Sequence, residues 1–197
     1  VMVKDLDNTM DWCVKHKDLT SKDILYLNDD SAEDPGTGSN NGIIDDLSST
    51  TTINFTNGGS GNMNMTNKSS TNYIMYSWAD VPGFQKFGAY DGTGSSTSWV
   101  DVDLGFRPAQ IVIKAKSFSD GWHVYDDKRD TFNPLGYRLW WSSNSSQSSG
   151  DFIEFTSTGF RVIYNDNGVN KDNEAFIYCA WAHQPAGTMW GGQSNAF

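Results

Sequence analysis

The 197-residue sequence has little cysteine and no long apolar run. Its two cysteines, Cys13 and Cys179, lie far apart in the chain and have no C-x-x-C or other metal or redox spacing. We interpret them as buried thiols on strands, with a disulfide as the alternative. No stretch approaches the ~18 consecutive apolar residues that a spanning helix requires, so we expect no membrane insertion.

Basic residues are also few, because 14 Lys and Arg stand against 24 Asp and Glu and give a formal net charge of −10. An acidic surface repels the phosphate backbone of nucleic acids. The densest basic pair, Lys128-Arg129, lies among acidic neighbours, and we therefore expect no nucleic-acid partner. Aromatic residues, in contrast, reach 14 % and supply enough apolar surface for a folded core.

Patterns typical of catalytic or metal sites are missing as well. The three histidines, His16, His123 and His183, show no metal-ligand spacing, and no G-x-S-x-G nucleophile motif is present. The Asp-rich segment 28–46 does not follow the ladder of oxygen ligands in an EF-hand, although an irregular Ca²⁺ site there stays an alternative to a solvated loop. We expect a protein that is not an enzyme and has no resident cofactor.

Strand patterns, by contrast, are abundant. The aliphatic run Ile111–Ile113 is typical of a buried strand, and residues 160–164 and 176–181 alternate with a period of two. Turn-forming dipeptides such as Asn167-Gly168 separate these runs. No window of ~12 residues shows a helical period, and residues 15–23 allow at most one short helical turn. The sequence predicts an all-β fold.

The chain also repeats itself in degenerate form. A shift of 110 positions pairs Val1–Lys4 with Ile111–Lys114 and Trp12 with Trp122. Shifts of 114 and 103 pair Leu25–Leu27 with Leu139–Trp141 and Trp78 with Trp181. The matched pieces follow one another in the same order in both halves, and only the loop lengths differ. We predict a tandem duplication, with a first repeat at 1–98 and a second at 99–197.

Each repeat has few strands and one open apolar face. We therefore expect the two sets to pack together as an antiparallel β-sandwich of the jelly-roll or lectin-like type, with two separate small barrels as the alternative. The first repeat opens directly on its strand, without the lead-in Gly105–Pro108 that precedes the equivalent strand. We expect the natural polypeptide to extend upstream of Val1 with a comparable turn.

Four tryptophans lie outside the best-matched strands, namely Trp99, Trp140, Trp141 and Trp190. An exposed tryptophan offers a large rigid face that stacks on the apolar face of a sugar ring or anchors a protein interface. Tryptophans at such positions also cap the ends of sandwiches or contact a neighbouring subunit. These four are therefore our candidates for glycan or interface contacts.

Two longer motifs complete the pattern. One runs from Gly105–Pro108 through the aliphatic strand to a tryptophan, then to the Asp-x-x-Arg element of Asp126 and Arg129 and to Asn133. The other is the connector VPGFQKFGAYDG at residues 81–92. In these motifs the chain resembles a repeated lectin/SPRY-like β-sandwich domain of tailed-bacteriophage structural proteins, marine and cyanophage ones especially, often described as tail-fibre-like. The first half departs from that pattern, because residues 1–98 contain no arginine.

The resemblance implies a non-enzymatic virion protein, specifically an external appendage or fibre module that touches host-surface glycans. It places the chain at the virion surface after assembly in the host cytoplasm, with other virion proteins as partners and a homo-oligomer, for which we expect a trimer. Asp126, Arg129 and Asn133 would then be a structural element of the family. The alternatives are a capsid-surface decoration or purely architectural subunit, and a glycan-active enzyme on the same kind of sandwich.

Overall fold

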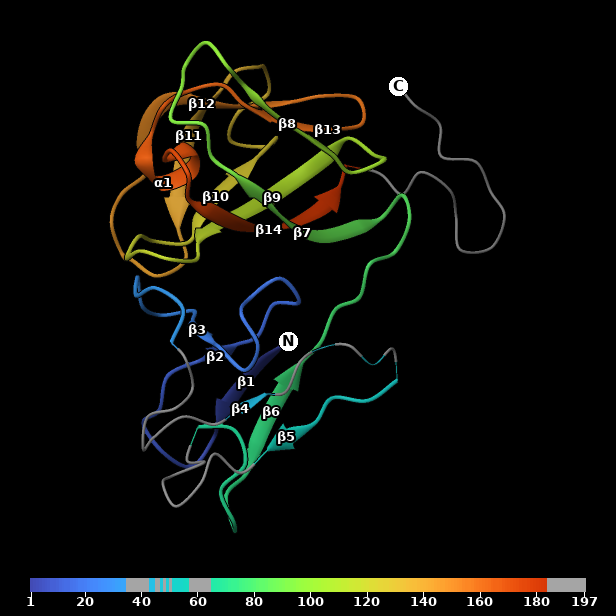
Figure 1. Ribbon diagram of the computed structural model, residues 1–197, viewed down its shortest axis with the longest axis vertical. Helices are drawn as coiled ribbons and strands as arrows, with labels where there is room; N and C mark the ends of the chain where they lie inside the picture. The colour runs from blue at the N-terminus through green and yellow to red at the C-terminus, as the bar shows by residue number, and fades with distance from the viewer. Residues whose placement is uncertain (35–42, 45–46, 48, 50, 57–64, 184–197) are drawn as a thin grey trace.

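The computed structural model describes residues 1–34, 43–44, 47, 49, 51–56 and 65–183. Strands joined by turns and loops make up nearly all of the regular structure in these residues, and the paired strands are antiparallel. The prediction of an all-β, antiparallel fold is therefore confirmed. Figure 1 shows two layers, with strands β7 to β14 in the upper one and β1 to β6 in the lower one.

The larger sheet contains eight strands in the order β7-β14-β9-β10-β11-β12-β13-β8 and curls into a nearly closed barrel (Figure 1). Its strands are β7 (Gln85–Asp91), β8 (Val100–Asp103), β9 (Pro108–Ala115), β10 (His123–Asp126), β11 (Leu135–Trp140), β12 (Ser148–Phe155), β13 (Gly159–Val162) and β14 (Ala175–Ala182). Strand β7 precedes residue 98, yet it pairs with β14 along its whole length. The connector between the two predicted repeats is thus part of the barrel wall.

Alternation along β14 explains why this strand is apolar on both faces. Phe176 and Tyr178 point into the barrel core, where they join Ile111 and Ile113 of β9. Ile177 lies on the opposite face, in a second apolar cluster outside the barrel. Because successive side chains of a strand point to opposite faces, a strand that is covered on both sides carries a nearly continuous apolar run.

The smaller sheet contains four strands in the order β3-β2-β1-β6. They are β1 (Met2–Asp5), β2 (Cys13–Val14), β3 (Leu25–Tyr26) and β6 (Tyr73–Tyr76), and β4 (Ile43–Ile44) pairs separately with β5 (Phe55–Thr56). Val14 and Leu25 pack against Val112, Val124 and Ile177 on the outer face of the barrel. The two layers therefore bury apolar faces against each other, as expected of a sandwich.

The smaller sheet has the same strand order as one part of the barrel, because β3-β2-β1-β6 corresponds to β11-β10-β9-β14. A row of paired residues crosses the smaller sheet through Tyr26, Cys13, Val3 and Met75. When the shifts of 114, 110 and 103 positions are applied, the residues that correspond to this row are Trp140, His123, Ile113 and Tyr178. These four residues are paired with one another in the barrel in the same order. This agreement of register supports the predicted duplication, which stays a hypothesis about the sequence.

Cys13 and Cys179 are free thiols. Cys13 lies on the face of the smaller sheet that is turned away from the barrel, in a cluster with Ile24 and Met65. Cys179 lies on the outer face of β14, against the smaller sheet. Burial raises the pKa of both thiols to about 12, so both are protonated and weakly reactive at neutral pH.

The turn predicted at Asn167-Gly168 is instead the start of a short helix, α1 (Asn167–Asn170). Asp166 caps this helix, because its side chain accepts a hydrogen bond from the backbone N–H of Gly168 at 2.9 Å. With four residues, α1 is a single turn. No helix in the described part of the chain is long and apolar enough to cross a membrane.

Candidate functional site

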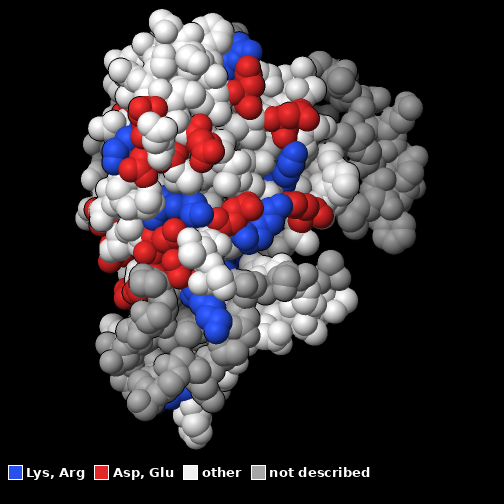
Figure 2. All heavy atoms as spheres, in the orientation of Figure 1, with Lys and Arg blue, Asp and Glu red and all other residues white. Residues whose placement is uncertain are grey.

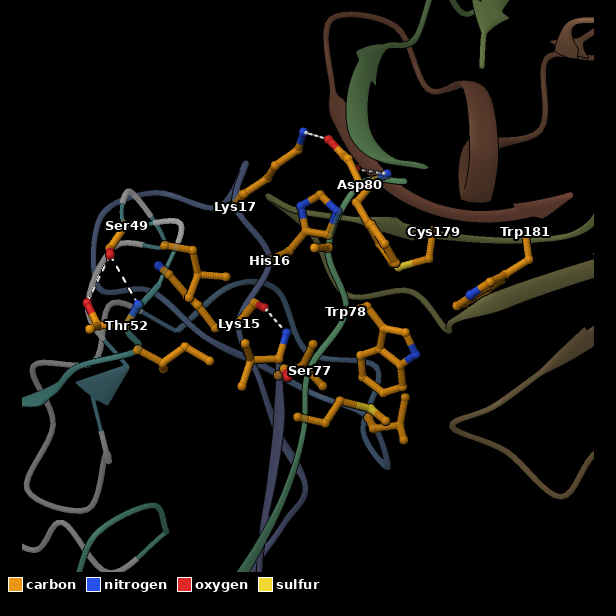
Figure 3. A pocket seen from close by; sticks show the side chains of 18 of the residues that line it. Lys15, His16, Lys17, Ser49, Thr52, Ser77, Trp78, Asp80, Cys179 and Trp181 are labelled. Carbon is orange, nitrogen blue, oxygen red and sulfur yellow. Dashed lines mark hydrogen bonds and ion pairs between the residues drawn. The ribbon is translucent and has the colours of Figure 1, made fainter. Parts of the chain in front are cut away.

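A cavity of about 680 Å³ lies where the smaller sheet meets the outer face of the barrel. Four tryptophans line it, namely Trp78, Trp122, Trp141 and Trp181. Figure 3 shows Trp78 and Trp181 reaching into this space from the smaller sheet and from β14, respectively. The cavity therefore gathers, from four separate segments of the chain, half of its eight tryptophans.

Strand geometry places each of these rings. Trp181 belongs to β14 and faces the smaller sheet, because it lies two residues from Cys179 on the same side of the strand. Trp78 follows β6, and Trp141 follows β11 directly. Trp122 precedes β10, and its ring N–H donates to the carbonyl of Tyr26 at 2.8 Å. That last hydrogen bond ties the barrel to the smaller sheet beneath the cavity.

The four rings differ in exposure. Trp122 is 2 % exposed, so its ring forms part of the apolar interface between the layers. Trp78 and Trp141 are 39 % and 42 % exposed and present their rings to solvent. Trp181 is half-buried and packs edge-on against Phe87. Three ring surfaces are therefore accessible to a ligand, and the fourth supports them from below.

Polar side chains stand at the rim of the cavity (Figure 3). Lys17 Nζ donates to Asp80 Oδ2 at 2.8 Å, and the other oxygen of Asp80 accepts from the backbone N–H of Phe87 at 2.8 Å. Burial raises the pKa of Asp80, but these hydrogen bonds outweigh it and the pKa is lowered. At neutral pH the rim therefore carries an ion pair beside the rings.

His16 lies in the wall of the cavity and is 6 % exposed. Its Nε2 is 3.2 Å from the carbonyl oxygen of Tyr178, and its Nδ1 accepts from the backbone N–H of Asp18 at 3.2 Å. Nε2 must then carry the proton and donate to the carbonyl. Burial lowers the pKa of the ring to about 4, so His16 is neutral at pH 7.

The chemistry that this arrangement offers is recognition by stacking and hydrogen bonding. Among the described residues of the lining, Asp80 is the one carboxylate. Glycoside hydrolysis ordinarily uses two carboxyl groups on opposite sides of the scissile bond. Aromatic faces bordered by a few polar groups are typical of sites that bind and orient a small ligand.

The structure places three of the four tryptophans predicted to contact a ligand, and it places them apart. Trp141 lines the cavity between the layers. Trp140 lines a smaller polar cavity of about 390 Å³ with Asp120. Trp99 is 52 % exposed on the outside of the barrel, 4.8 Å from the guanidinium of Arg161. The fourth, Trp190, lies outside the described residues.

Trp78, Trp122 and Trp181 were not among the predicted contacts, because they belong to the matched strands and look like core residues in the sequence. A signal was nevertheless present. The shift of 103 pairs Trp78 with Trp181, so both occupy equivalent positions in the two predicted repeats. Both rings line the cavity in the structure.

Asp126 and Arg129 form a closed turn after β10. Asp126 accepts from the backbone N–H groups of Lys128 and Arg129 and from the guanidinium of Arg129. Arg129 also donates to the carbonyl of Val124 at 2.8 Å. Burial raises the pKa of Asp126, but its hydrogen bonds with Arg129 outweigh this and lower it. The described contacts of this pair therefore fix the turn.

Asn133 clamps the following loop to β12. Its side-chain nitrogen donates to the carbonyl of Phe155 at 2.7 Å, and its side-chain oxygen accepts from the N–H of the same residue at 2.9 Å. This pair of hydrogen bonds imitates one rung of a β-ladder. The Asp-x-x-Arg element and Asn133 thus both hold loops against the barrel.

The Asp-rich segment 28–46 is described only in part. Asp29 accepts hydrogen bonds from Ser31, which lower the pKa of Asp29, and Asp34 accepts from the hydroxyl of Tyr26 at 2.9 Å. Within the residues that the structure describes, no group of three or more His, Cys, Asp or Glu side chains is placed to hold a metal ion. Residues 35–42, 45 and 46 lie outside that part.

Comparison with known proteins adds one finding. Residues 1–185 match a family described as a domain of unknown function, DUF7483. The chain belongs to this family. The DUF7483 region includes both sheets and all residues that line the tryptophan cavity. No curated protein matched the chain. No solved structure matched it either.

Proposed function

We propose that this DUF7483 chain is a non-enzymatic binding module of a bacteriophage virion, and that its tryptophan cavity binds carbohydrate on the host surface. The observation that carries the proposal is the convergence of Trp78, Trp141 and Trp181 on one cavity with a polar rim. The location on a virion rests on the resemblance of the sequence motifs to phage structural domains. Other virion proteins are the proposed partners, in an assembly of several copies of the chain.

Sugar rings suit this cavity for a physical reason. Each ring has an apolar face of C–H groups, which stacks on an aromatic ring, and a border of hydroxyl groups, which need hydrogen-bond partners. Trp78 and Trp141 supply accessible ring faces. Lys17, Asp80 and Ser77 supply polar groups at the rim. A short oligosaccharide can therefore have its apolar faces and its hydroxyl groups satisfied at the same time.

The charge of the protein favours a neutral glycan over an acidic one. The formal net charge is −10, and an anionic polysaccharide would approach against this field. On the face shown in Figure 2, Lys and Arg are interspersed among Asp and Glu and form no continuous basic surface within the described residues. We therefore propose neutral hexose-containing oligosaccharides as the class of ligand.

The test is a glycan array followed by calorimetric titration with neutral oligosaccharides. Stacking of nucleobases on aromatic side chains is worth about 1–3 kcal/mol, and we expect a similar order for a sugar ring. The Trp78→Ala and Trp141→Ala variants should therefore bind about five- to 150-fold more weakly than the wild type. Trp99→Ala is the matched control, because this exposed tryptophan lies outside the lining of the cavity.

The results that would count against the proposal are distinct. Equal losses in Trp99→Ala and Trp78→Ala would show that the cavity is not the site. Release of reducing ends from a bound polysaccharide would show an enzyme. Immunogold labelling of phage particles tests the virion location, and labelling confined to the capsid shell would favour a decoration protein over an appendage.

A further inference from the structure

Strand β6 forms one edge of the smaller sheet in the described part of the chain. Strand β6 is the last strand of that sheet and pairs with β1 on one side. The backbone N–H of Leu6 donates to the carbonyl of Asn72, so the even-numbered residues of this segment direct their N–H and C=O groups toward β1. Because these directions alternate along a strand, the N–H and C=O groups of Met75 point away from β1. The same holds for Ser77, which lies just beyond the strand. No strand in the described part of the chain pairs with this edge.

The barrel shows what covers the equivalent edge. Under the shift of 103, β6 corresponds to β14, and Met75 corresponds to Tyr178. Strand β14 pairs with β9 on one side, as β6 pairs with β1, and with β7 on the other side. Tyr178 lies opposite Gly88 of β7. The edge that β7 covers on β14 is therefore the edge of β6 on which no described strand lies.

The exposed side chains near this edge fit an interface better than a free surface. Met75 and Tyr76 are 45 % and 44 % exposed, although both belong to a strand. An edge strand with unpaired peptide groups and apolar side chains readily pairs with another strand. Native proteins blunt such edges with lysine or proline, and the segment from Tyr73 to Asp80 contains neither.

The side chain at the central position also accommodates an incoming strand. On β14, a Cβ atom added to Gly88 would lie 2.5 Å from the hydroxyl of Tyr178, so β7 needs glycine there. On β6 the equivalent residue is Met75, whose side chain is unbranched and adapts its shape to a neighbour. A strand with the sequence pattern of β7 therefore fits this edge with glycine at that position.

We propose that this edge of β6 accepts a β7-type strand, antiparallel to β6, donated by another domain of the same family. The incoming strand adds a fifth strand to the smaller sheet, with main-chain hydrogen bonds for affinity and side-chain fit for register. The segment that delivers it has the pattern of the connector, residues 81–92.

The test uses the whole chain and a synthetic peptide with the sequence of residues 81–92. The peptide is titrated into isotopically labelled protein, and the amide resonances are followed by NMR. We expect the largest shifts at Met75 and Ser77 and slowed hydrogen exchange of the Met75 amide. Shifts confined to other surfaces, or no shifts, would overturn the proposal.

Two methylated peptides make the test specific. In β7 the N–H of Gly88 faces β14, whereas the N–H of Phe87 points away and donates to Asp80. A peptide methylated on the nitrogen of Gly88 should bind at least about tenfold more weakly, because it loses a main-chain donor and clashes at the edge. Methylation on Phe87 should leave binding unchanged, and equal effects of the two would refute a β-ladder.

A protein variant and a hydrodynamic measurement complete the design. Met75→Pro removes only an outward N–H, which an edge strand tolerates, and should abolish peptide binding. If this variant fails to fold, the comparison of the two methylated peptides still tests whether the peptide pairs with β6 as a strand. Sedimentation of the wild type without peptide tests the alternative occupant, because dimerisation that Met75→Pro abolishes would assign the edge to a second copy.

Discussion

Protonation of His16 should weaken the contact between the two layers, and the structure sets the size of the effect. The ring is buried between the sheets, with Nε2 bonded to Tyr178 of the barrel and Nδ1 accepting from Asp18 of its own layer. A proton on Nδ1 would break the second hydrogen bond and put a charge into a buried site, where the Asp18 carboxylate at 3.6 Å offsets only part of the cost of desolvation. Burial accordingly lowers the pKa of the ring to about 4.

The sign follows from the two pKa values of His16. In the unfolded chain the pKa is about 6.5, and in the folded protein it is about 4. Between these values the unfolded state binds more protons, so the free energy of unfolding falls as the pH drops from about 6.5 to about 4. A difference of this size corresponds to a loss of about 3 kcal/mol at the acid end, taken as an upper bound.

The assay is urea unfolding followed by tryptophan fluorescence at a series of pH values from about 7.5 down to about 4.5. The His16→Gln variant has no titrating ring and should lose most of the pH dependence in this range. Leu19→Ala is the control, because Leu19 is a buried non-titrating residue in the apolar cluster between the layers. It should lower stability by a similar amount at every pH and keep the wild-type slope. If His16→Gln keeps that slope, the assignment to His16 is wrong.

Two further predictions concern the barrel. Asn133→Ala should destabilise the protein by about 2 kcal/mol in urea unfolding, because it removes both hydrogen bonds to Phe155; an unchanged midpoint would refute the clamp. Gly159→Ala should cost more than Gly105→Ala. A Cβ atom added at Gly159 would clash with the carbonyl oxygen of Val102. A Cβ atom added at Gly105 would meet no other atom, so the cost of that substitution is the backbone strain of a positive φ of +81°, which is about 1 kcal/mol. The reverse order would contradict the packing between β8 and β13.

The strands could be predicted from the sequence because their alternation is local. Ile111–Ile113 lies within β9, and residues 176–181 lie within β14. Closure of the barrel could not be predicted in the same way. It depends on the pairing of β8 with β13 and of β7 with β14, and these contacts join segments that no local pattern relates.

The candidate site shows the same limit more sharply. Trp141 is one of the four predicted contacts, and the structure places it in the lining of the cavity. The sequence does not indicate that Trp78 and Trp181 line the same cavity, because a tryptophan in an apolar strand looks the same whether its exposed edge meets solvent, a core or a cavity. Their accessibility is decided by how closely the two layers approach each other, which is a property of tertiary packing.

The size of the facing side chains changes along the interface between the two layers. Where the equivalent residues are the small side chains Val14 and Val124, both are buried in one apolar cluster and the layers meet. At the ends of β6 and β14 the equivalent residues are Trp78 and Trp181, and Tyr76 stacks beside the first at 6.2 Å. Two indole rings from opposing layers need more room than two isopropyl groups, and both rings stay partly exposed in the lining of the cavity. Side chains of this size therefore account for an aromatic cavity at this end of the interface, where valines would let the layers close.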